Sequence, residues 1–337
     1  MRQPLDIRQM HLAVEKQLTG VIDTCIPDDY HEMKSMLAYH LGWEGEGAGP
    51  DAQGKRIRSV LVLLSAVAAG GDWEDALPAA ASVELIHNFS LIHDDIQDHS
   101  SLRRGRATVW VKWGMGQAIN AGDLMFTLAF SAIRKLKDTV SPDAAIEAYE
   151  ILQAACIRLT GGQYLDLQNE KARGLELEAY WSMIGGKTAA LLACCAELGA
   201  LSAHAQSTKR QAFHNFGEKL GLAFQVQDDW LGIWGDATRT GKSTQSDLVS
   251  GKKSLPVVYG LTLGLKFAER WLGEPIQANE VQEIAKILED EGVKDFTEKI
   301  ANQLTTEALA ALDQAAPESQ GKSELLHLAE SLLRRDY

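Results

Sequence analysis

With 337 residues, 45% of them hydrophobic and 23% charged, the chain is long enough and apolar enough to bury a sizeable core. Its formal net charge of −13 argues against a nucleic-acid-binding protein, which typically carries a basic balance or stripe. Its four cysteines form no CxxC pair and it has no apolar run long enough for a bilayer, so we expect a cytoplasmic protein with reduced cysteines and no transmembrane segment.

Apolar residues recur every three or four positions along most of the chain, which is the spacing of amphipathic helices. We expect helices near residues 6–19, 28–42, 54–69, 76–99, 117–137, 143–160, 176–201, 206–233, 252–265, 278–292, 294–314 and 322–335. The breaks between them carry the residues of turns. Since neither strand-like alternation nor a linker composition occurs, the sequence predicts an all-α fold of about a dozen helices in a single domain, residues 1–337.

The fourth expected helix ends in the stretch LIHDDIQDHSSLRRGR, in which three carboxylates are followed by three arginines. Asp94 and Asp98 share a helix face, with Asp95 about 100° round the axis. Like charges on one face repel, and a divalent cation would offset that repulsion. Carboxylates without His or Cys ligands favour Mg²⁺, which takes one or two carboxylates plus water and substrate phosphates. The cluster therefore predicts a phosphorylated ligand, whose remaining oxygens Arg103 and Arg104 can bind.

A second acidic pair, Asp228 and Asp229, follows another long apolar stretch in FQVQDDWLGIWGD, where Gly232 takes the position that matches Asp98. Both helices are apolar on more than one face, which is typical of helices surrounded by others. We therefore expect their ends to bring two carboxylate groups to the mouth of one bundle, a common place for a metal site. Further cations lie near turns: Lys55, Arg56, Arg58, Lys187, Lys242, Lys252 and Lys253.

The stretches LIHDDIQDHSSLRRGRATVW, GLAFQVQDDWLGIWGD and GKSTQSDLVSGKKSLP resemble the trans-polyprenyl diphosphate synthase family, and the resemblance covers roughly residues 20 to 335. It implies an isoprenoid synthase fold around a deep central cavity and, usually, a homodimer. It also implies a Mg²⁺-dependent prenyltransferase of isoprenoid biosynthesis. Such an enzyme joins isopentenyl diphosphate to an allylic diphosphate head to tail, with three metal ions bound beside the diphosphate.

The resemblance assigns roles to matching positions. Asp94, Asp98 and Asp228 match the metal ligands and, with Lys187 and Lys242, the catalytic residues, while Asp95 supports the first group. The isopentenyl diphosphate site matches Lys55, Arg58, His87 and Arg104. The allylic diphosphate site matches Arg103, Lys187, Thr188, Gln225, Lys242 and Lys252, and GGQYLDL adds Gln163 and Asp166. Helix geometry agrees at one point, because His87 lies seven residues before Asp94 and about 20° from it round the helix.

Three positions depart from the family pattern: Gln53 replaces a glycine, Ser59 a proline, and Gly232 the last acid of the second motif. One turn after Asp228, residue 232 is expected toward the cavity mouth and outside the groups that touch a metal, with Asp236 lending charge. On that interpretation an aspartate at 232 changes turnover by less than about tenfold.

Product size is inferred from Phe89, five residues before Asp94, and from its small neighbour Ser90. In the resembling family this pair goes with a C20 product, so geranylgeranyl diphosphate is expected as the main product and farnesyl diphosphate as the second. By angle alone Phe89 lies about 140° from Asp94 round the helix, and an ordinary core phenylalanine is the alternative interpretation.

Two other functions stay open. A catalytically inactive helical subunit that supports an active synthase would share the fold, although such subunits commonly lose acids or cationic contacts that this chain keeps. A class I terpene cyclase shares the fold and the first acidic motif, but it would need a hydroxyl or an acid where Gly232 stands and would need no isopentenyl diphosphate site. The preferred primer and the pathway served are not predicted.

Overall fold

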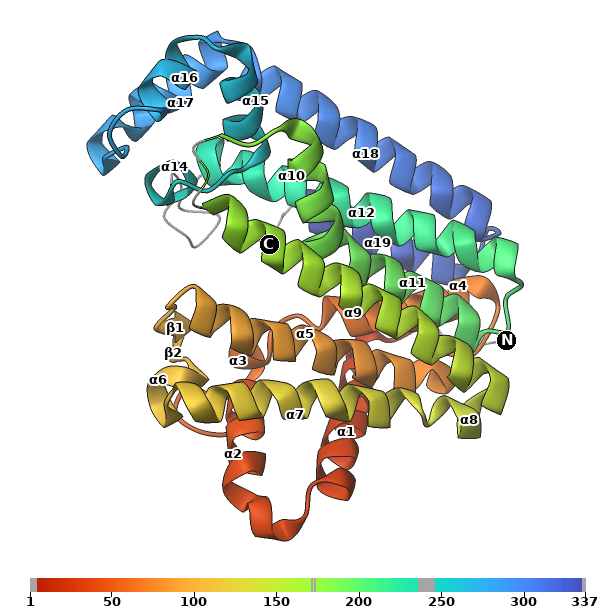
Figure 1. Ribbon diagram of the computed structural model, residues 1–337. Helices are drawn as coiled ribbons and strands as arrows, with labels where there is room; N and C mark the ends of the chain where they lie inside the picture. The colour runs from red at the N-terminus through yellow and green to blue at the C-terminus, as the bar shows by residue number, and fades with distance from the viewer. Residues whose placement is uncertain (1–4, 171, 173, 236–245, 335–337) are drawn as a thin grey trace. The chain divides into compact units, whose positions relative to one another are not determined.

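The computed structural model describes residues 5–170, 172, 174–235 and 246–334. These residues belong to two compact units, whose helices are labelled in Figure 1. Unit 1 comprises residues 1–153, 195–210 and 316–325, and unit 2 comprises residues 154–194, 211–315 and 326–337. Both units include parts of α9 (Pro142–Glu170), α11 (Ala190–Ser202), α12 (Ser207–Trp234) and α19 (Gln320–Arg334). The single domain expected from the sequence stays a prediction.

The elements that lie wholly in unit 1 come from the first part of the chain. They are α1 (Ile7–Cys25), the 3₁₀ turn η1 (Asp28–Tyr30), α2 (His31–His40), α3 (Pro50–Gln53), α4 (Ile57–Ala69), η2 (Glu74–Ala76), α5 (Leu77–Gln97), β1 (Leu102–Arg103), β2 (Arg106–Ala107), α6 (Val109–Trp113), α7 (Met115–Ile133) and α8 (Leu136–Thr139). The two short strands pair antiparallel, with Arg103 opposite Arg106.

The elements that lie wholly in unit 2 are α10 (Leu177–Ile184), the π-helix η3 (Gly185–Ala189), α14 (Ser246–Ser250), α15 (Leu255–Leu263), α16 (Lys266–Trp271), η4 (Ala278–Glu280), α17 (Val281–Asp290) and α18 (Val293–Ala315). Every helix expected from the sequence is present, and the all-α fold class is confirmed. The sequence pattern missed the short helices α3, α6, α8, α14 and α16, because a helix of four to six residues is too short to show a period.

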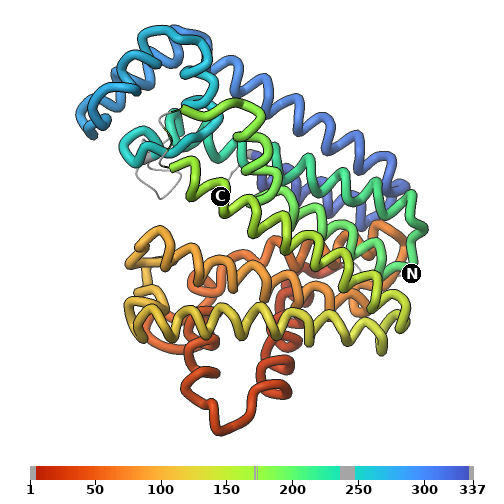
Figure 2. The backbone as a smooth tube through the Cα atoms, viewed as in Figure 1, coloured from red at the N-terminus to blue at the C-terminus, as the bar shows by residue number. Residues whose placement is uncertain are grey.

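The core of unit 1 is built on α4 and α5. Leu61, Leu63 and Leu64 of α4 and Leu85 of α5 are fully buried. α5 begins with Pro78 in its first turn, where the missing N–H costs nothing. It packs along α7 and also against α4 and α1, and α5 and α7 run side by side in Figures 1 and 2. The acidic end of α5 is therefore carried by a helix that is held along its length.

The core of unit 2 has two clusters. In the first, Tyr180 and Ile184 of α10 pack with Val226 of α12 and with Leu255 at the start of α15. The second joins α15, α16 and α17 around residues such as Phe267. Burying a large apolar side chain contributes about 1.5–3 kcal/mol relative to leaving it exposed. The second acidic pair lies on α12, so this packing holds its backbone in place.

The end of α9 differs from the sequence-based expectation. The helix was expected to stop at residue 160, before the glycine pair, but it continues through Gly161 and Gly162 to Glu170. A Cβ atom on Gly162 would lie 2.1 Å from the backbone nitrogen of Lys187, and one on Gly186 would lie 2.5 Å from the carbonyl oxygen of Arg158. The glycines therefore mark a close crossing of α9 and η3, not a helix end.

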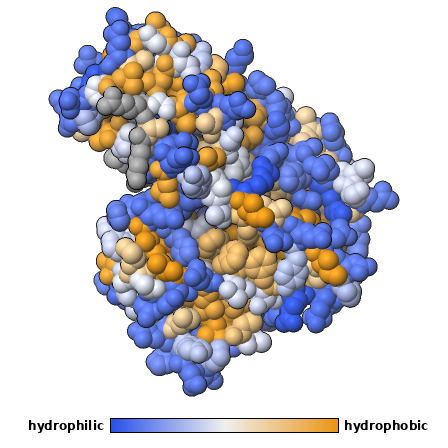
Figure 3. All heavy atoms as spheres, viewed as in Figure 1, coloured by the Kyte–Doolittle hydropathy of each residue, from blue (hydrophilic) through white to orange (hydrophobic). Residues whose placement is uncertain are grey.

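Large apolar side chains are exposed on α6 and α7 in unit 1. Val111 is 47% exposed, Met115 49% and Ile119 42%. Figure 3 shows apolar atoms among polar ones over α6 and the first part of α7. Such a group of exposed apolar residues is typical of a surface that another molecule covers.

One helical stretch, Leu177–Ser202, is long and apolar enough to cross a membrane by length and composition. However, 83% of its most apolar window is buried inside the protein. The stretch is therefore only weak evidence for a membrane span, since the buried core helix of a globular protein meets the same criteria.

Candidate active site

The first acidic pair divides into a buried and a more exposed carboxylate. Asp95 is 2% exposed, and Arg103 binds it through Nε, 2.9 Å from both carboxylate oxygens, and through Nη2, 2.8 Å from Oδ1. Burial raises the pKa of Asp95, and the hydrogen bonds and charge of Arg103 oppose the rise. Asp94 is half-buried and Asp98 is exposed at the C-cap of α5. The Asp98 amide nitrogen lies 2.8 Å from the Asp94 carbonyl oxygen, so these two acids are one helical turn apart, as expected.

The second acidic pair shows the same division. Asp229 is 1% exposed, whereas the side chain of Asp228 is 26% exposed. The Asp229 carboxylate accepts hydrogen bonds from Tyr180 Oη (2.7 Å), Gln225 Nε2 (3.0 Å), Lys252 Nζ (3.1 Å) and the Leu255 amide nitrogen (2.9 Å). Burial raises the pKa of Tyr180 well above its ordinary value, and Asp229 adds to the rise, so the phenol stays a neutral donor. Asp229 therefore ties α10, α12 and α15 together, and Asp228 is left nearer the surface.

Lys252 lies among three carboxylates of unit 2. Its Nζ is 3.1 Å from Asp229, 3.4 Å from Asp247 and 3.9 Å from Asp228. Burial alone lowers the pKa of Lys252, but the carboxylates of Asp229, Asp247 and Asp228 outweigh it and raise the pKa above the ordinary value. The lysine therefore stays charged and offsets the repulsion among the acids.

A cationic cluster occupies one end of unit 1. Arg58 Nη1 lies 3.1 Å from Nε2 of His87, and Arg104 Nη1 donates to the carbonyl oxygens of Ala52 and Gln53, 2.8 Å from each. Burial, together with Arg58 and Arg104, lowers the pKa of His87 well below its ordinary value. Burial also lowers the pKa of both arginines, and Arg56 adds to the fall for Arg104. The histidine is therefore neutral, and the cluster would be stabilised by an anion.

Arg56 differs from the cations on either side of it. It is 5% exposed, with Nε 2.6 Å from Glu15 Oε1 and Nη1 2.9 Å from Glu84 Oε1. Ser59 Oγ donates to the Arg56 carbonyl oxygen and to Glu84 Oε2, at 2.9 and 3.2 Å. Arg56 lies near a turn, as expected, but it is neutralised inside the core and is not available to a ligand. Ser59, where the family pattern has proline, supports this ion-pair network.

The backbone is strained at two of these arginines. Arg56 has φ of 49° and Arg104 has φ of 51°, in the left-handed region that non-glycine residues rarely adopt. Each such residue costs on the order of 1–3 kcal/mol, and such residues cluster at functional sites. Here the strain accompanies the arginine contacts to Glu15, Glu84, Ala52 and Gln53.

In unit 2, three further predicted site residues are joined by hydrogen bonds or ion pairs. Lys187 on η3 forms an ion pair with Asp166 of α9, and its side chain is 31% exposed. Thr188 Oγ1 donates to Gln225 Oε1 at 2.8 Å, and Gln225 in turn donates to Asp229. These contacts place the π-helix against α12 and hold Lys187 at a defined position.

The remaining predicted cations have different surroundings. Lys55 is exposed between α3 and α4. Lys253 Nζ donates to the carbonyl oxygens of Glu170 (3.3 Å) and Gly251 (3.0 Å), so its ammonium group links two backbone segments. Lys242 and Asp236 lie outside the described residues.

Sequence reasoning missed His40, at the end of α2. Burial, with Arg103 and Arg104 next in effect, lowers its pKa to about 3, although a hydrogen bond with Asn88 opposes the fall. It lines a small cavity with Arg103, Arg104 and Asp95. The stretch MLAYHLGW around it carries no motif, so nothing in the sequence indicated that it lies beside the arginines.

Phe89 belongs to a row of half-buried rings in unit 1. Its ring lies edge-to-face with Phe126 of α7 at 5.1 Å between centroids, and Phe126 lies 5.2 Å from Phe130. Phe130 stacks on Tyr149 at 5.8 Å. Ser90 Oγ donates to the His87 carbonyl oxygen at 2.8 Å. The Phe89 side chain thus points toward α7 and forms an apolar wall with the neighbouring rings. Its angle on the helix alone did not predict this contact with α7.

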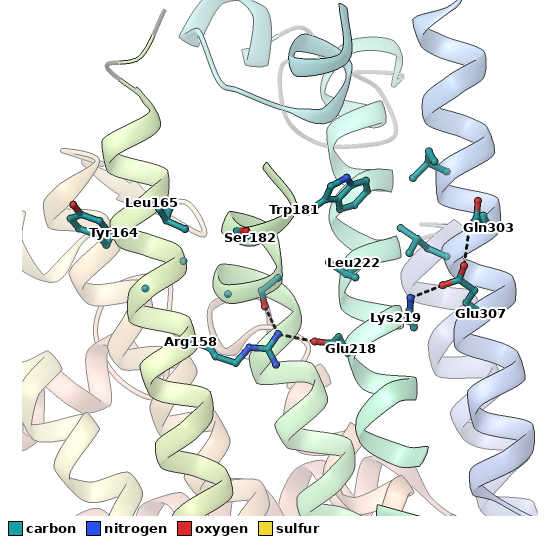
Figure 4. A pocket seen from close by; sticks show the side chains of 16 residues that line it. Arg158, Tyr164, Leu165, Trp181, Ser182, Glu218, Lys219, Leu222, Gln303 and Glu307 are labelled. Carbon is teal, nitrogen blue, oxygen red and sulfur yellow. Dashed lines mark hydrogen bonds and ion pairs between the residues drawn. The ribbon is translucent and has the colours of Figure 1, made fainter. Parts of the chain in front are cut away.

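A groove of about 780 Å³ crosses α9, α10, η3, α12 and α18 in unit 2. As Figure 4 shows, Arg158 reaches across to Glu218 (2.7 Å), and Lys219 pairs with Glu307 (2.6 Å). Among the described residues, none of the predicted site residues lines this groove. Its lining is thus made of other residues, although Gly186 directly precedes Lys187 in the chain.

The donor atoms of the acidic residues indicate which metal ion they could hold. Within the part of the chain that the structure describes, no three His, Cys, Asp or Glu side chains are arranged to hold a metal ion by themselves. Mg²⁺ does not need such a cage, since it keeps several waters and takes one or two carboxylates plus phosphate oxygens. In unit 1, Asp94 and Asp98, one turn apart, offer only oxygen donors, and in unit 2 the partly exposed Asp228 does the same. Each set by itself fits a hard divalent ion that binds together with a phosphorylated ligand.

Known proteins resemble the chain over most of its length. A family model described as "Polyprenyl synthetase" matches residues 49–290. The geranylgeranyl diphosphate synthase of Mycobacterium tuberculosis is 36% identical over 323 residues, covering 94% of this chain and 90% of that protein. The (2E,6E)-farnesyl diphosphate synthase of the same organism is 38% identical over 313 residues, covering 90% of this chain and 86% of that protein. Overall identity is thus nearly the same to enzymes named for different products.

Solved structures share the fold. A polyprenyl synthetase from Streptomyces coelicolor A3(2) superposes with a TM-score of 0.86 at 35% identity, covering 97% of this chain and 98% of that one. A polyprenyl synthase from Caulobacter crescentus CB15, solved in complex with calcium and isoprenyl diphosphate, gives a TM-score of 0.79 at 30% identity, with 100% of both chains covered.

Proposed function

The chain belongs to the polyprenyl synthetase family, and on this premise we propose that it is a Mg²⁺-dependent prenyltransferase that condenses isopentenyl diphosphate with allylic diphosphates head to tail. The division of the two acidic pairs carries the proposal. In each pair one aspartate is locked in its unit by buried hydrogen bonds, and its neighbour keeps a more accessible carboxylate. Such an arrangement holds metal-binding acids in position while their carboxylates stay more accessible than those of their buried neighbours.

We assign Lys55, Arg58, His87 and Arg104 to the isopentenyl diphosphate. This diphosphate does not leave during the reaction, so it is held by fixed cations. The lowered pKa values of His87, Arg58 and Arg104 support the assignment, because an anion would relieve their mutual repulsion. Arg104 is aimed by its bonds to Ala52 and Gln53, and Arg58 by its contact with His87.

We assign Asp94, Asp98 and Asp228 to the metal ions. We propose that three ions bind together with the diphosphate. When present, Mg²⁺ supplies positive charge that stabilises the departing diphosphate. The relative from Caulobacter crescentus, described with calcium and isoprenyl diphosphate, supports divalent-metal binding in this family. Asp95 and Asp229 anchor the helices that carry these acids, so we expect the acids to keep the positions in which they bind the metal ions.

The allylic diphosphate is assigned to Arg103, Lys187, Thr188, Gln225, Lys252 and, outside the described residues, Lys242. Lys187, oriented by Asp166, can donate to the leaving group as its charge grows. Lys252 remains charged among its carboxylates and contributes to the same field. Thr188 and Gln225 hydrogen-bond each other, so we give them a positioning role.

Once the diphosphate leaves, the allylic cation must be kept from water until the isopentenyl double bond attacks it. Apolar walls such as the rings of Phe89 and Phe126 suit this task. A proton is then lost from the new C–C bonded intermediate, and the departed diphosphate is the base we propose for it. Geranylgeranyl diphosphate is the proposed main product and farnesyl diphosphate the second, because Phe89 blocks the tail and Ser90 does not.

We also propose that the enzyme is a cytoplasmic homodimer that binds no nucleic acid. Exposed Val111, Met115 and Ile119 on unit 1 support an apolar contact with a second copy. The net charge of −13 supports the absence of a nucleic-acid partner.

The proposal is tested with the purified chain alone, isopentenyl diphosphate and C5, C10 or C15 allylic primers. We expect linear products with Mg²⁺ and none with EDTA. Asp94→Ala, Asp98→Ala and Asp228→Ala should each lower turnover by about 10²-fold or more, as does the loss of a group that stabilises a transition state. Activity that needs a second, different subunit would indicate an inactive partner, and cyclic hydrocarbons would indicate a terpene cyclase. Neither alternative is favoured by the similarity to named diphosphate synthases.

A further inference from the structure

The ion pairs around Arg56 hold one carboxylate more than the arginine needs. Arg56 lies between Glu15 of α1 and Glu84 of α5, with its Nε 2.6 Å from Glu15 Oε1 and its Nη1 2.9 Å from Glu84 Oε1. Two carboxylates and one guanidinium leave a negative charge in excess. The side chain of Glu15 is 21% exposed and can be solvated, whereas that of Glu84 is 3% exposed. A buried charge is costly unless it is paired, so the excess at Glu84 calls for a further cation nearby.

The Glu84 carboxylate is held beside two residues of the proposed isopentenyl diphosphate site. Its Oε1 also accepts from Asn88 Nδ2 at 3.1 Å, and its Oε2 accepts from Ser59 Oγ at 3.2 Å. Ser59 directly follows Arg58 on α4, and Asn88 directly follows His87 on α5. The carboxylate is therefore fixed to the two helices that carry Arg58 and His87.

The charge of Glu84 acts on the cations of that site. Burial lowers the pKa of Arg58 and of Arg104, and the negative charge of Glu84 opposes the fall in both. Glu15 has other partners, because it accepts from Arg56 and from Trp43 Nε1 at 2.5 Å. Of the two carboxylates that hold Arg56, Glu84 is thus the one that also offsets the repulsion between the ligand-binding arginines.

We propose that Glu84 is an internal counter-ion that limits how tightly the isopentenyl diphosphate site holds its diphosphate. While the site is empty, the carboxylate stabilises Arg58 and Arg104 beside each other. Once a diphosphate is bound, the same carboxylate repels it and weakens its binding. The proposal rests on the proposed function in one respect, namely the assignment of these cations to isopentenyl diphosphate.

A limit on affinity suits an enzyme that repeats its condensation. Each new product keeps the diphosphate that entered on isopentenyl diphosphate, and it must act as the allylic primer of the next round. That diphosphate therefore has to leave the cationic site after every round. Differences in affinity between related complexes lie mostly in the dissociation rate, so a site without the internal anion would release the product more slowly.

The test measures binding of inorganic diphosphate by calorimetry in the presence of EDTA, which excludes binding through a metal ion. Glu84→Gln keeps the shape of the side chain and should bind diphosphate about tenfold more tightly, the order expected when one buried like charge near a ligand is removed. Glu15→Gln is the matched control, because it removes the other carboxylate of Arg56, and it should change the affinity by less than about threefold. Arg58→Gln should abolish the binding, which identifies the site that is measured.

Equal or weaker binding by Glu84→Gln would overturn the proposal, because a residue with only a structural role would not tighten binding when it is replaced. If Glu84→Gln does not fold, two double variants take its place: Arg56→Gln with Glu84→Gln, and Arg56→Gln with Glu15→Gln. They carry the same net charge and differ only in the carboxylate that remains. The variant that keeps Glu84 should bind diphosphate about tenfold more weakly than the other, and equal affinities would again overturn the proposal.

Failure of the proposed function gives a different result. A wild type that binds diphosphate but forms no prenyl product with Mg²⁺ would refute the proposed function, while the comparison of Glu84→Gln with Glu15→Gln would still decide the role of Glu84. A wild type that binds no diphosphate would refute the assignment of the site and the counter-ion with it.

Discussion

Replacing Asp229 should lower the thermal stability of unit 2 strongly. Asp229→Ala removes the acceptor of hydrogen bonds from Tyr180, Gln225, Lys252 and the Leu255 amide. Breaking a buried charged pair costs about 3–5 kcal/mol, and a buried donor left without an acceptor costs about 1–3 kcal/mol. Lys252 can turn toward solvent or toward Asp247, since its side chain is 38% exposed. We therefore expect a total loss of about 3–5 kcal/mol and do not add the orphaned donors to the cost of the ion pair.

The assay compares Asp229→Ala with its neighbour Asp228→Ala. For domains of 150–250 residues, 1 kcal/mol shifts the thermal midpoint by about 2–4 °C, so Asp229→Ala should lower it by roughly 6–20 °C. Asp228→Ala should lower it little, because the carboxylate is partly exposed and the Lys252 ammonium lies 3.9 Å away. Its turnover should nevertheless fall by about 10²-fold. Equal thermal midpoints for the two variants would refute the division into anchor and ligand.

Three further predictions concern product size, acid stability and assembly. Phe89→Ala should lengthen the product by at least one isoprene unit, until the prenyl tail meets Phe126, and Ser90→Phe should shorten the product toward C15. Chromatography of the dephosphorylated alcohols measures both changes. An unchanged product distribution in Phe89→Ala would show that another residue limits the chain length. His40 has its pKa lowered from 6.5 to about 3, so the unfolded chain binds the extra proton between these values and stability falls as the pH falls through that window. His40→Gln should remove up to about 1.4 kcal/mol per pH unit of this loss, and parallel denaturation curves for both proteins from pH 6.5 to 4 would count against it. Met115→Glu with Ile119→Glu should convert a dimer to a monomer in sedimentation, whereas a wild type that is already monomeric would disprove the proposed contact.

The helices and the acidic motifs were predictable because they depend on local pattern. Apolar spacing located α5 and α12, and the i, i+4 rule placed Asp94 and Asp98 one turn apart. The short helices and the true end of α9 were not, because they depend on what packs against them. The pair Gly161–Gly162 has the composition of a break, but the helix continues through it, and the missing side chain of Gly162 makes room for the crossing with η3.

The contacts of neighbouring residues within the site were less predictable. Helix angle separated Asp95 from Asp94 and Asp98, but it did not indicate that Asp95 is buried against Arg103. Likewise Arg56 turns into the core toward Glu15 and Glu84, while Arg58 reaches His87. Which face of a helix meets a neighbour is set by tertiary packing, and the close approach of Asp247 to Gly232 is likewise not local in the sequence.

The close crossing of α9 and η3 has a practical consequence for anyone who randomises this chain to obtain new products. Positions 162 and 186 accept no side chain, because a single added carbon on either would meet backbone atoms at 2.1 and 2.5 Å. Library members altered there would be lost to misfolding before any product could be scored. Diversity is better placed at Phe89, Phe126 and Phe130, whose half-buried rings contact one another's side chains and not the backbone of a crossing helix.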